Sequence, residues 1–208
     1  MKIQLALDRL TREKCFQVIK ETEHYIDLIE VGTGVIKEYG MTIIREIKVK
    51  YPDITLVADM KTCDAGKFET VQAFEAGADI TTVMAFSAKK TITDSLDEAE
   101  KYNKRIMVDL LGIQDQSKMI ELEELGVDLV SLHFGKDMQQ EGELPTDLFT
   151  LTNKSQRFEV AVAGGINLTT LPDIIKKNPD IIIVGSAITQ AENMNKVASE
   201  MKGLISKL

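Results

Sequence analysis

The chain repeats a unit of roughly 50 residues, and this repeat limits the folds that it can adopt. Three segments with the related sequences LALD, LVAD and IMVD end at Asp8, Asp59 and Asp109, which are 51 and 50 residues apart. A second series of aspartates starts the intervening apolar segments, at intervals of 52, 49 and 52 residues: Asp27, Asp79, Asp128 and Asp180. Self-similarity at a fixed period indicates that one supersecondary unit recurs along the chain.

Eight short apolar runs rich in β-branched residues alternate with longer stretches in which apolar residues recur three and four positions apart. The runs cover residues 3–7, 26–31, 54–58, 80–84, 106–108, 129–133, 160–163 and 181–184. Continuous apolar runs are typical of strands buried on both faces of a parallel sheet, and the stretches between them have the spacing of amphipathic helices. We therefore expect an α/β fold, a single (β/α)8 TIM barrel. A doubly wound open sheet is the alternative.

The size and composition of the chain favour one domain, residues 1–208. At 208 residues the chain can bury one substantial core, and this length is at the short end of what an eight-unit barrel requires. The hydrophobic fraction of 44% and the charged fraction of 28% are ordinary for a globular protein. No stretch has the composition of a linker or a disordered tail.

The net charge of -8 argues against a nucleic-acid partner, because binding to a phosphate backbone requires clustered cations. A small phosphorylated ligand remains compatible, since a few backbone N–H groups hold one phosphate. We expect no signal peptide and no membrane helix, because no apolar stretch is long enough. Two thiols, Cys15 and Cys63, do not make a disulfide framework, so we expect a soluble cytoplasmic protein.

Polar residues stand where the predicted strands end, which is where a parallel barrel binds its ligand. These residues are Asp8, Glu30, Asp59, Asp109 and His133, with Thr33, Lys61 and Asp64 in the segments that follow. A single strand-end aspartate is usually a loop cap or the partner of a nearby lysine. So many ionisable groups together instead predict a functional site, because burying them without a use is unfavourable. The aspartates at the strand starts lie on the opposite rim and are interpreted as structural.

The segment DMKTCD, residues 59–64, is the sharpest local feature. Alternate residues of an extended strand share a face, so we expect Asp59 and Lys61 to point into the barrel mouth and Asp64 to reach in from the loop. A cation between carboxylates stays charged and stabilises an oxyanion or enediolate on a substrate. Cys63 has no histidine nearby in sequence to activate it, so we interpret it as a small packing residue.

Glu30 and Asp59 end neighbouring predicted strands and are candidate ligands for Mg2+, which prefers one or two carboxylates together with water and substrate oxygens. The alternative is that Glu30 pairs with Lys61. His133 closes a strand, where an imidazole can transfer a proton near neutral pH, or where it is simply hydrogen-bonded within the rim. We expect the other histidine, His24, to be a solvated surface residue.

Glycine motifs follow the last two predicted strands, as AGGI and VGSAI. They contain Gly164, Gly165, Gly185 and Ser186. Glycines in these two loops let backbone N–H groups approach a phosphate, which is the commonest phosphate position in a TIM barrel. Ordinary tight turns are the alternative.

The order of motifs ALD, EVGT, ADMKTCDAG, MVD, HFGKD, AVAGGI and VGSAI covers essentially the whole chain. It resembles the orotidine-5'-monophosphate decarboxylase superfamily, and within it the 3-hexulose-6-phosphate synthases. The resemblance implies a lyase that condenses D-ribulose 5-phosphate with formaldehyde through a Mg2+-stabilised enediolate. The sister 3-keto-L-gulonate-6-phosphate decarboxylases share most of these motifs, so a decarboxylase that releases L-xylulose 5-phosphate and CO2 is the alternative.

The resemblance also implies roles for individual residues. Glu30 and Asp59 match the family's metal ligands, Lys61 its electrophilic lysine and His133 its proton-transfer residue. The remaining matches are Asp8 and Asp109, which contact the sugar, and the glycine motifs, which bind the phosphate. We count Asp109 with Lys61, Asp64 and His133 as catalytic.

Family members are homodimers in which the last aspartate of the motif, here Asp64, reaches into the neighbouring subunit's site. A homodimer is therefore expected. Thr33 and Lys136 are further candidates for substrate binding, and Lys136 stands where the decarboxylases carry a cation, whereas Asp109 is the shorter carboxylate typical of the synthases. A barrel that binds sugar phosphates without catalysis is an alternative from another class, since fold does not fix function. An epimerase is disfavoured, because that chemistry usually relies on more strand-end histidines.

Overall fold

The computed structural model describes residues 1–140, 146–152 and 157–206, and in these ranges eight parallel strands close into a barrel in chain order. The strands are β1 Lys2–Leu7, β2 Leu28–Val31, β3 Thr55–Thr62, β4 Ile80–Met84, β5 Arg105–Asp109, β6 Leu129–His133, β7 Glu159–Ala163 and β8 Ile181–Val184. The first and last strands pair in parallel, with Ile3 opposite Ile182. The predicted (β/α)8 barrel is therefore confirmed, and the open sheet is wrong.

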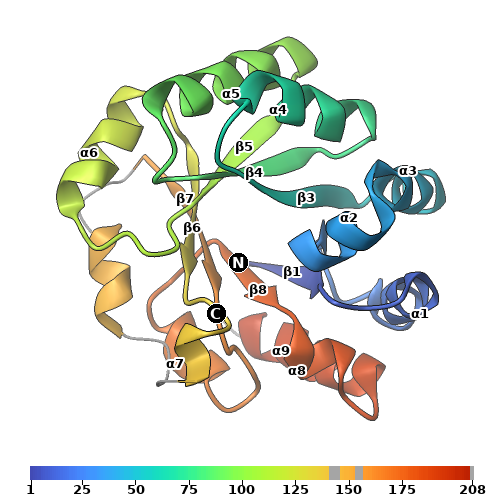
Figure 1. Ribbon diagram of the computed structural model, residues 1–208. Coiled ribbons are helices and arrows are strands. Elements are labelled where there is room, and N and C mark those ends of the chain that lie inside the picture. Colours follow the sequence, from blue (N-terminus) through green and yellow to red (C-terminus); the bar gives the residue numbers. More distant parts are fainter. Residues whose placement is uncertain (141–145, 153–156, 207–208) are drawn as a thin grey trace.

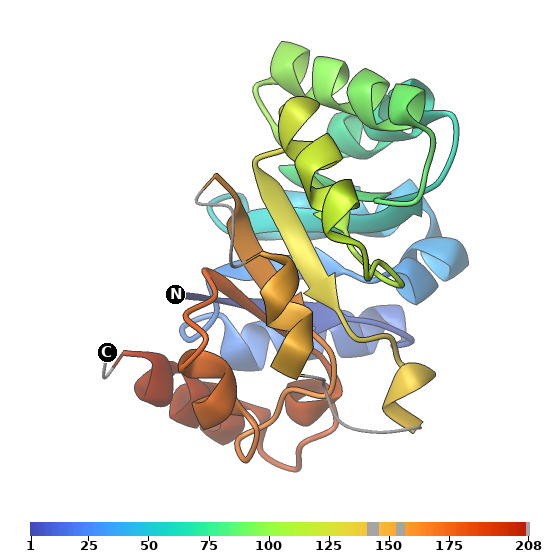
Figure 2. The same ribbon diagram turned by 90° about the vertical axis from the view of Figure 1, so that its left-hand side faces the viewer.

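Helices surround the strands on the outside of the barrel (Figure 1). The α-helices of the described ranges are α1 Arg12–Thr22, α2 Thr33–Tyr39, α3 Met41–Lys50, α4 Gly66–Glu75, α5 Lys89–Tyr102, α6 Gln116–Glu124, α7 Leu171–Ile175, α8 Ser186–Thr189 and α9 Met194–Ile205. Two short 3-10 helices, η1 Met138–Gln140 and η2 Thr146–Leu151, lie between β6 and β7. In the view of Figure 2, η1 lies beyond the C-terminal end of β6. No helix of the described ranges combines the length and apolarity needed to cross a bilayer.

The core has two layers because both faces of each strand are covered. The larger layer lies between barrel and helices, where Ile3 and Leu5 of β1 pack with Cys15 and Ile19 of α1. The smaller layer fills the barrel interior with buried side chains from seven strands: Leu28, Val57, Ile80, Met107, Leu129, Ala161, Ile181 and Ile183. A TIM barrel is thus a packed core with no through channel, and its ligand binds above this layer.

The aspartates at the strand starts tie the barrel together at its N-terminal rim. Each of Asp27, Asp79, Asp128 and Asp180 accepts a hydrogen bond from the odd-numbered strand that precedes it in the chain. The donors are, in the same order, the backbone N–H groups of Ile3 and Leu56, the guanidinium of Arg105 and the backbone N–H group of Val160. The contacts agree with a structural role for this series.

Candidate active site

A cavity of about 820 Å3 opens at the C-terminal ends of the strands. All but one of the candidate site residues line it: Asp8, Glu30, Thr33, Asp59, Lys61, Asp109, His133, Lys136, Gly164, Gly165, Gly185 and Ser186. The strand ends of a closed barrel converge on one mouth, so residues from distant parts of the chain meet there. Their individual roles stay predictions.

The exception is Asp64, which is exposed and does not line this cavity. The expectation that Asp64 reaches into the mouth of its own barrel is therefore wrong. The chain turns outward after β3, because Ala65 takes a left-handed backbone conformation (φ 53°) and α4 begins at Gly66. A role of Asp64 in a second subunit stays a prediction.

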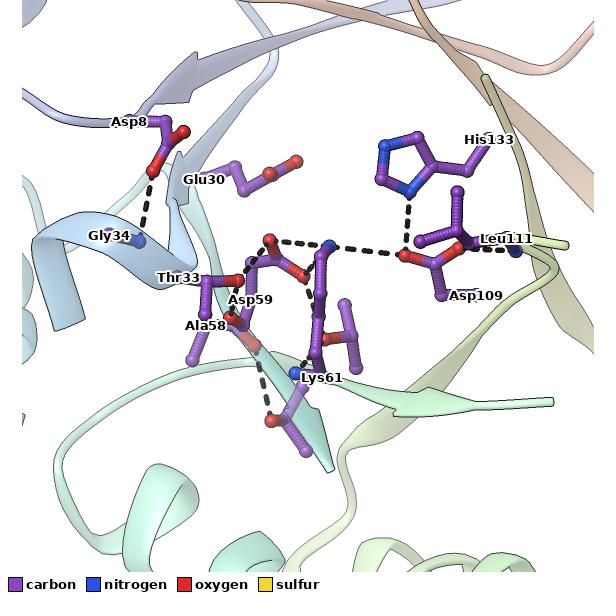
Figure 3. A network of polar contacts seen from close by, with 12 residues as sticks. Asp8, Glu30, Thr33, Gly34, Ala58, Asp59, Lys61, Asp109, Leu111 and His133 are labelled. Carbon is purple, nitrogen blue, oxygen red and sulfur yellow. Dashed lines mark hydrogen bonds and ion pairs between the residues drawn. The ribbon is translucent and has the colours of Figure 1, made fainter. Parts of the chain in front are cut away.

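Lys61 lies at the centre of the polar network (Figure 3). Its Nζ is 2.9 and 2.8 Å from the two carboxylate oxygens of Asp59 and 3.1 Å from Oδ2 of Asp109. Burial alone lowers the pKa of Lys61, but the charges of Asp59 and Asp109 outweigh it, and the pKa is raised above its ordinary value. The ammonium therefore stays charged at any pH at which the protein works, and it is available to stabilise a developing oxyanion.

A bulge in β3 aims the Lys61 side chain. The pairing between β3 and β4 shifts register between Ala58 and Thr62, and Lys61 has a left-handed backbone conformation (φ 49°). Both side chains line the barrel mouth, as predicted. The reason given for this is wrong, because Asp59 and Lys61 are not alternate residues of a regular extended strand. Bulges commonly re-aim a side chain beside an active site.

Asp109 and His133 form a buried pair. Nδ1 of His133 is 2.8 Å from Oδ2 of Asp109, and the other Asp109 oxygen accepts a hydrogen bond from the N–H of Leu111. Burial opposes ionisation of Asp109, but the hydrogen bond and charge of His133, with the charge of Lys61, lower the pKa of Asp109. Burial likewise opposes protonation of His133, but Asp109 outweighs it and raises the pKa of His133 above 6.5. Figure 3 shows the second ring nitrogen of His133 on the side of the ring away from Asp109.

Two threonine hydroxyls hold the carboxylate of Asp59. Thr33 Oγ1 lies 2.8 Å from Oδ2 and 2.8 Å from the backbone carbonyl oxygen of Asp59. Thr82 Oγ1 donates to Oδ1 over 2.9 Å. Thr82 is not among the residues predicted from the sequence, although the threonine pair inside the buried strand ITTVM is an available signal, since buried hydroxyls need partners.

Glu30 reaches the same cavity from β2 and accepts a hydrogen bond from the side-chain amide of Gln4. Burial and the neighbouring charge of Asp59 raise the pKa of Glu30 from its ordinary 4.5 to about 7. In the described part of the chain, Glu30 forms no ion pair with Lys61, whose carboxylate partners are Asp59 and Asp109. The alternative of a Glu30–Lys61 pair is therefore wrong. Gln4 is fully buried and was also missed, although it interrupts the apolar segment KIQLAL.

The donor set at the mouth fits a hard divalent cation that keeps some of its own water. Within the described ranges, no three His, Cys, Asp or Glu side chains cluster as a complete metal cage. The carboxylates of Glu30 and Asp59 extend into the same space (Figure 3), and their mutual repulsion contributes to the raised pKa of Glu30. Two such carboxylates match the preference of Mg2+ for one or two protein ligands, the rest being water and substrate oxygens.

The glycine loops after β7 and β8 bring backbone close to the cavity. Gly164 has a φ of 127°, and a Cβ there would lie 2.5 Å from the carbonyl oxygen of Phe134, so no other residue fits. Gly165 also has a positive φ, of 63°, and both line the cavity with Gly185. These loops can present N–H groups to a phosphate.

The structure decides three further expectations. Asp8 lines the cavity, where it accepts a hydrogen bond from the N–H of Gly34 and pairs with Arg9. His24 is exposed, as expected. The interpretation of Cys63 as a small packing residue is wrong, because Cys63 is exposed and its thiol contacts the carbonyl oxygen of Lys61.

A family model, relatives in sequence and solved structures all relate the chain to the same family. Residues 1–201 match the model of the family described as "Orotidine 5'-phosphate decarboxylase / HUMPS family". A 3-hexulose-6-phosphate synthase of Bacillus subtilis is 42% identical over 207 residues, 99% of each chain. The crystal structure of 3-hexulose-6-phosphate synthase from Salmonella typhimurium has a TM-score of 0.97 at 36% identity and covers 100% of this chain and 99% of its own. A 3-keto-L-gulonate-6-phosphate decarboxylase of Vibrio cholerae has a TM-score of 0.86 at 28% identity, covering 99% of this chain and 97% of its own.

We expect Glu30→Gln to stabilise the metal-free protein at high pH. Because the folded-state pKa of Glu30 is raised to about 7, its contribution to stability is present below its ordinary 4.5 and is lost as the pH rises through 7. The uncharged variant escapes this loss, so in EDTA its melting temperature at pH 9 should exceed that of the wild type by about 5 °C, with no difference near pH 4.5.

Glu46→Gln is the matched control for this prediction. Glu46 pairs with Arg12 outside the cavity, and its pKa is lowered by that hydrogen bond, so the substitution should not stabilise the protein at pH 9. Equal melting temperatures of wild type and Glu30→Gln across the pH range would show that Glu30 is not under strain from burial and charge.

Proposed function

The chain belongs to the orotidine 5'-phosphate decarboxylase / HUMPS family, and from this premise we propose that it acts as a 3-hexulose-6-phosphate synthase. It is a carbon–carbon lyase that joins formaldehyde to D-ribulose 5-phosphate. The observation that carries the proposal is the network in which Lys61 contacts Asp59 and Asp109 while His133 pairs with Asp109, all in one cavity. This arrangement combines a fixed cation with a proton-transfer group.

The reaction needs a carbanion at C1 of the ketose. A proton leaves C1, the resulting enediolate forms a bond from C1 to the formaldehyde carbon, and the formaldehyde oxygen takes up a proton. The ammonium of Lys61 supplies positive charge where the enediolate oxygens develop negative charge. It is held in place before the substrate arrives, so little reorganisation is needed in the transition state.

His133 moves the proton. When Nδ1–H donates to Asp109, the second ring nitrogen carries a lone pair and acts as the base that removes the C1 proton. The same nitrogen then returns a proton to the formaldehyde oxygen. Asp109 raises the pKa of His133 above its ordinary value, which stabilises the imidazolium that forms when the ring takes up the C1 proton.

The rest of the cavity binds the substrate. Gly164, Gly165, Gly185 and Ser186 would hold the phosphate, and Asp8 and Lys136, which also line the cavity, would contact the rest of the sugar phosphate. Glu30 and Asp59 would hold Mg2+, which when bound provides Lewis-acid stabilisation of negative oxygen. A cytoplasmic location is also part of the proposal. It is supported by the two free thiols, Cys15, which is buried, and Cys63, which is exposed.

One observation favours the second candidate, decarboxylation of 3-keto-L-gulonate 6-phosphate. Lys136 lines the cavity, and a cation there can assist protonation after CO2 leaves. The same enediolate chemistry serves both reactions, so the arrangement of Lys61 and His133 does not separate them. An assay with both substrates separates condensation from decarboxylation.

A homodimer completes the proposal. Asp64 is exposed and does not line its own cavity, and Phe68 of α4, shortly after it in the chain, is 75% exposed. Phe86, in the loop after the neighbouring strand β4, is 57% exposed. Exposed aromatic side chains in the segments that follow β3 and β4 fit a surface covered by a second copy, whose cavity Asp64 would then reach.

The direct test is an assay of the purified protein with D-ribulose 5-phosphate, with and without formaldehyde. We expect formaldehyde-dependent loss of ribulose 5-phosphate, abolished by EDTA and restored by Mg2+, because the carboxylates lose their ion. Release of CO2 from 3-keto-L-gulonate 6-phosphate at a higher kcat/KM would favour the decarboxylase. Absence of turnover with both substrates would leave a barrel that only binds sugar phosphates.

Mixing two inactive variants tests the shared site. Lys61→Met and Asp64→Ala should each abolish condensation alone. Refolded together, they should recover about a quarter of the wild-type activity, because each mixed dimer contains one site with both residues intact. A mixture as inactive as its parents, or a monomer in sedimentation, would contradict the contribution of Asp64 across an interface.

A further inference from the structure

Thr82 contacts both functional residues of β3 through a single atom. It lies in the middle of β4, is 4% exposed and lines the cavity. Its Oγ1 donates to Oδ1 of Asp59 over 2.9 Å and accepts a hydrogen bond from the backbone N–H of Lys61 over 2.8 Å. A threonine hydroxyl has one proton to donate, so these two contacts fix its orientation.

The backbone of Lys61 needs such a partner. Because the β3–β4 pairing shifts register between Ala58 and Thr62, Lys61 lies in the irregular part of the ladder, with a left-handed conformation that a lysine rarely adopts. The hydroxyl of Thr82 supplies the acceptor for its N–H group. Conformations of this kind persist only where surrounding contacts hold them.

The same hydroxyl also constrains the carboxylate. Thr82 holds Oδ1 of Asp59, and Thr33 contacts Oδ2, so the carboxylate plane is fixed from both sides. Without Thr82, Oδ1 retains only the contact with the Lys61 ammonium, and the two side chains can move together. The positions of the Asp59 carboxylate and the Lys61 ammonium relative to the substrate would then no longer be fixed by a contact with β4.

We propose that Thr82 is a positioning residue, whose hydroxyl sets the placement of the Asp59 carboxylate and the Lys61 side chain for catalysis. The proposal rests on the proposed function, in which Lys61 stabilises the enediolate and Asp59 binds the metal. Thr82 itself acts through these two residues and takes no part in the chemistry.

The neighbouring Thr81 provides a matched control. Thr81 is also fully buried in β4, and its hydroxyl bonds the backbone carbonyl oxygen of Ala58, but it does not line the cavity. Thr81→Val and Thr82→Val remove the same group from adjacent positions of one strand and keep the shape of the side chain. A general effect of losing a buried hydroxyl therefore appears in both variants.

The experiment compares Thr82→Val, Thr82→Ser and Thr81→Val by two readouts. The first is kcat for condensation of ribulose 5-phosphate with formaldehyde. The second is the dissociation constant for Mn2+ in the substrate-free protein, measured by electron paramagnetic resonance. We expect Thr82→Val to lower kcat by about 10- to 100-fold and to weaken Mn2+ binding, because misplacement of a catalytic group by about 1 Å can cost about 100-fold in rate. Thr82→Ser keeps both hydrogen bonds and should restore both readouts, and Thr81→Val should resemble the wild type.

The outcomes separate the two proposals. If Thr82→Val matches Thr81→Val in kcat or in Mn2+ affinity, or if Thr82→Ser fails to restore them, the positioning role is overturned. If Thr82→Val does not fold, as judged by circular dichroism, Thr82→Ala replaces it. If the wild type shows no condensation at all, the proposed function fails, and the Mn2+ comparison alone still decides whether Thr82 sets the geometry of Asp59.

Discussion

The ammonium of Lys61, held between the carboxylates of Asp59 and Asp109, is the interaction on which the rest of the site depends. Asp109 and Asp59 are 3% and 7% exposed, and two buried like charges are unfavourable without a cation between them. The single positive charge of Lys61 offsets the repulsion between them, and Asp109 in turn orients His133. Lys61 and His133, the proposed electrophile and proton-transfer group, are therefore linked through one carboxylate, that of Asp109.

The rest of the closed barrel supplies the stability that this concentration of charge at the mouth reduces. Its N-terminal rim is fixed by aspartates such as Asp27 and Asp79, which bind backbone N–H groups, and its interior is filled with apolar side chains. The C-terminal mouth is then free to carry residues that reduce stability, such as Glu30 with its pKa of about 7. Stability and function are divided between the two ends of the same strands, as in other enzymes of this architecture.

Much of this was predictable from the sequence, because periodic apolar runs report strands and a parallel barrel brings their ends together. The repeat that ends at Asp8, Asp59 and Asp109 located the mouth directly. Thr82 and Gln4 were missed, since a polar residue inside a buried strand reveals its partner only when the register is known. The bulge at Lys61 and the outward turn at Ala65 depend on pairing with β4 and on backbone conformation, which the pattern of residues does not encode.

The central claim is that carboxylates from successive strands, balanced by Lys61, hold one divalent cation beside the substrate. Calorimetric titration of Mg2+ into the wild type and Glu30→Gln tests it most directly, with the surface variant Glu200→Gln as control. The account predicts one Mg2+ per chain for the wild type and the control, and an affinity lower by at least about tenfold for Glu30→Gln. Equal affinity in all three proteins would contradict it.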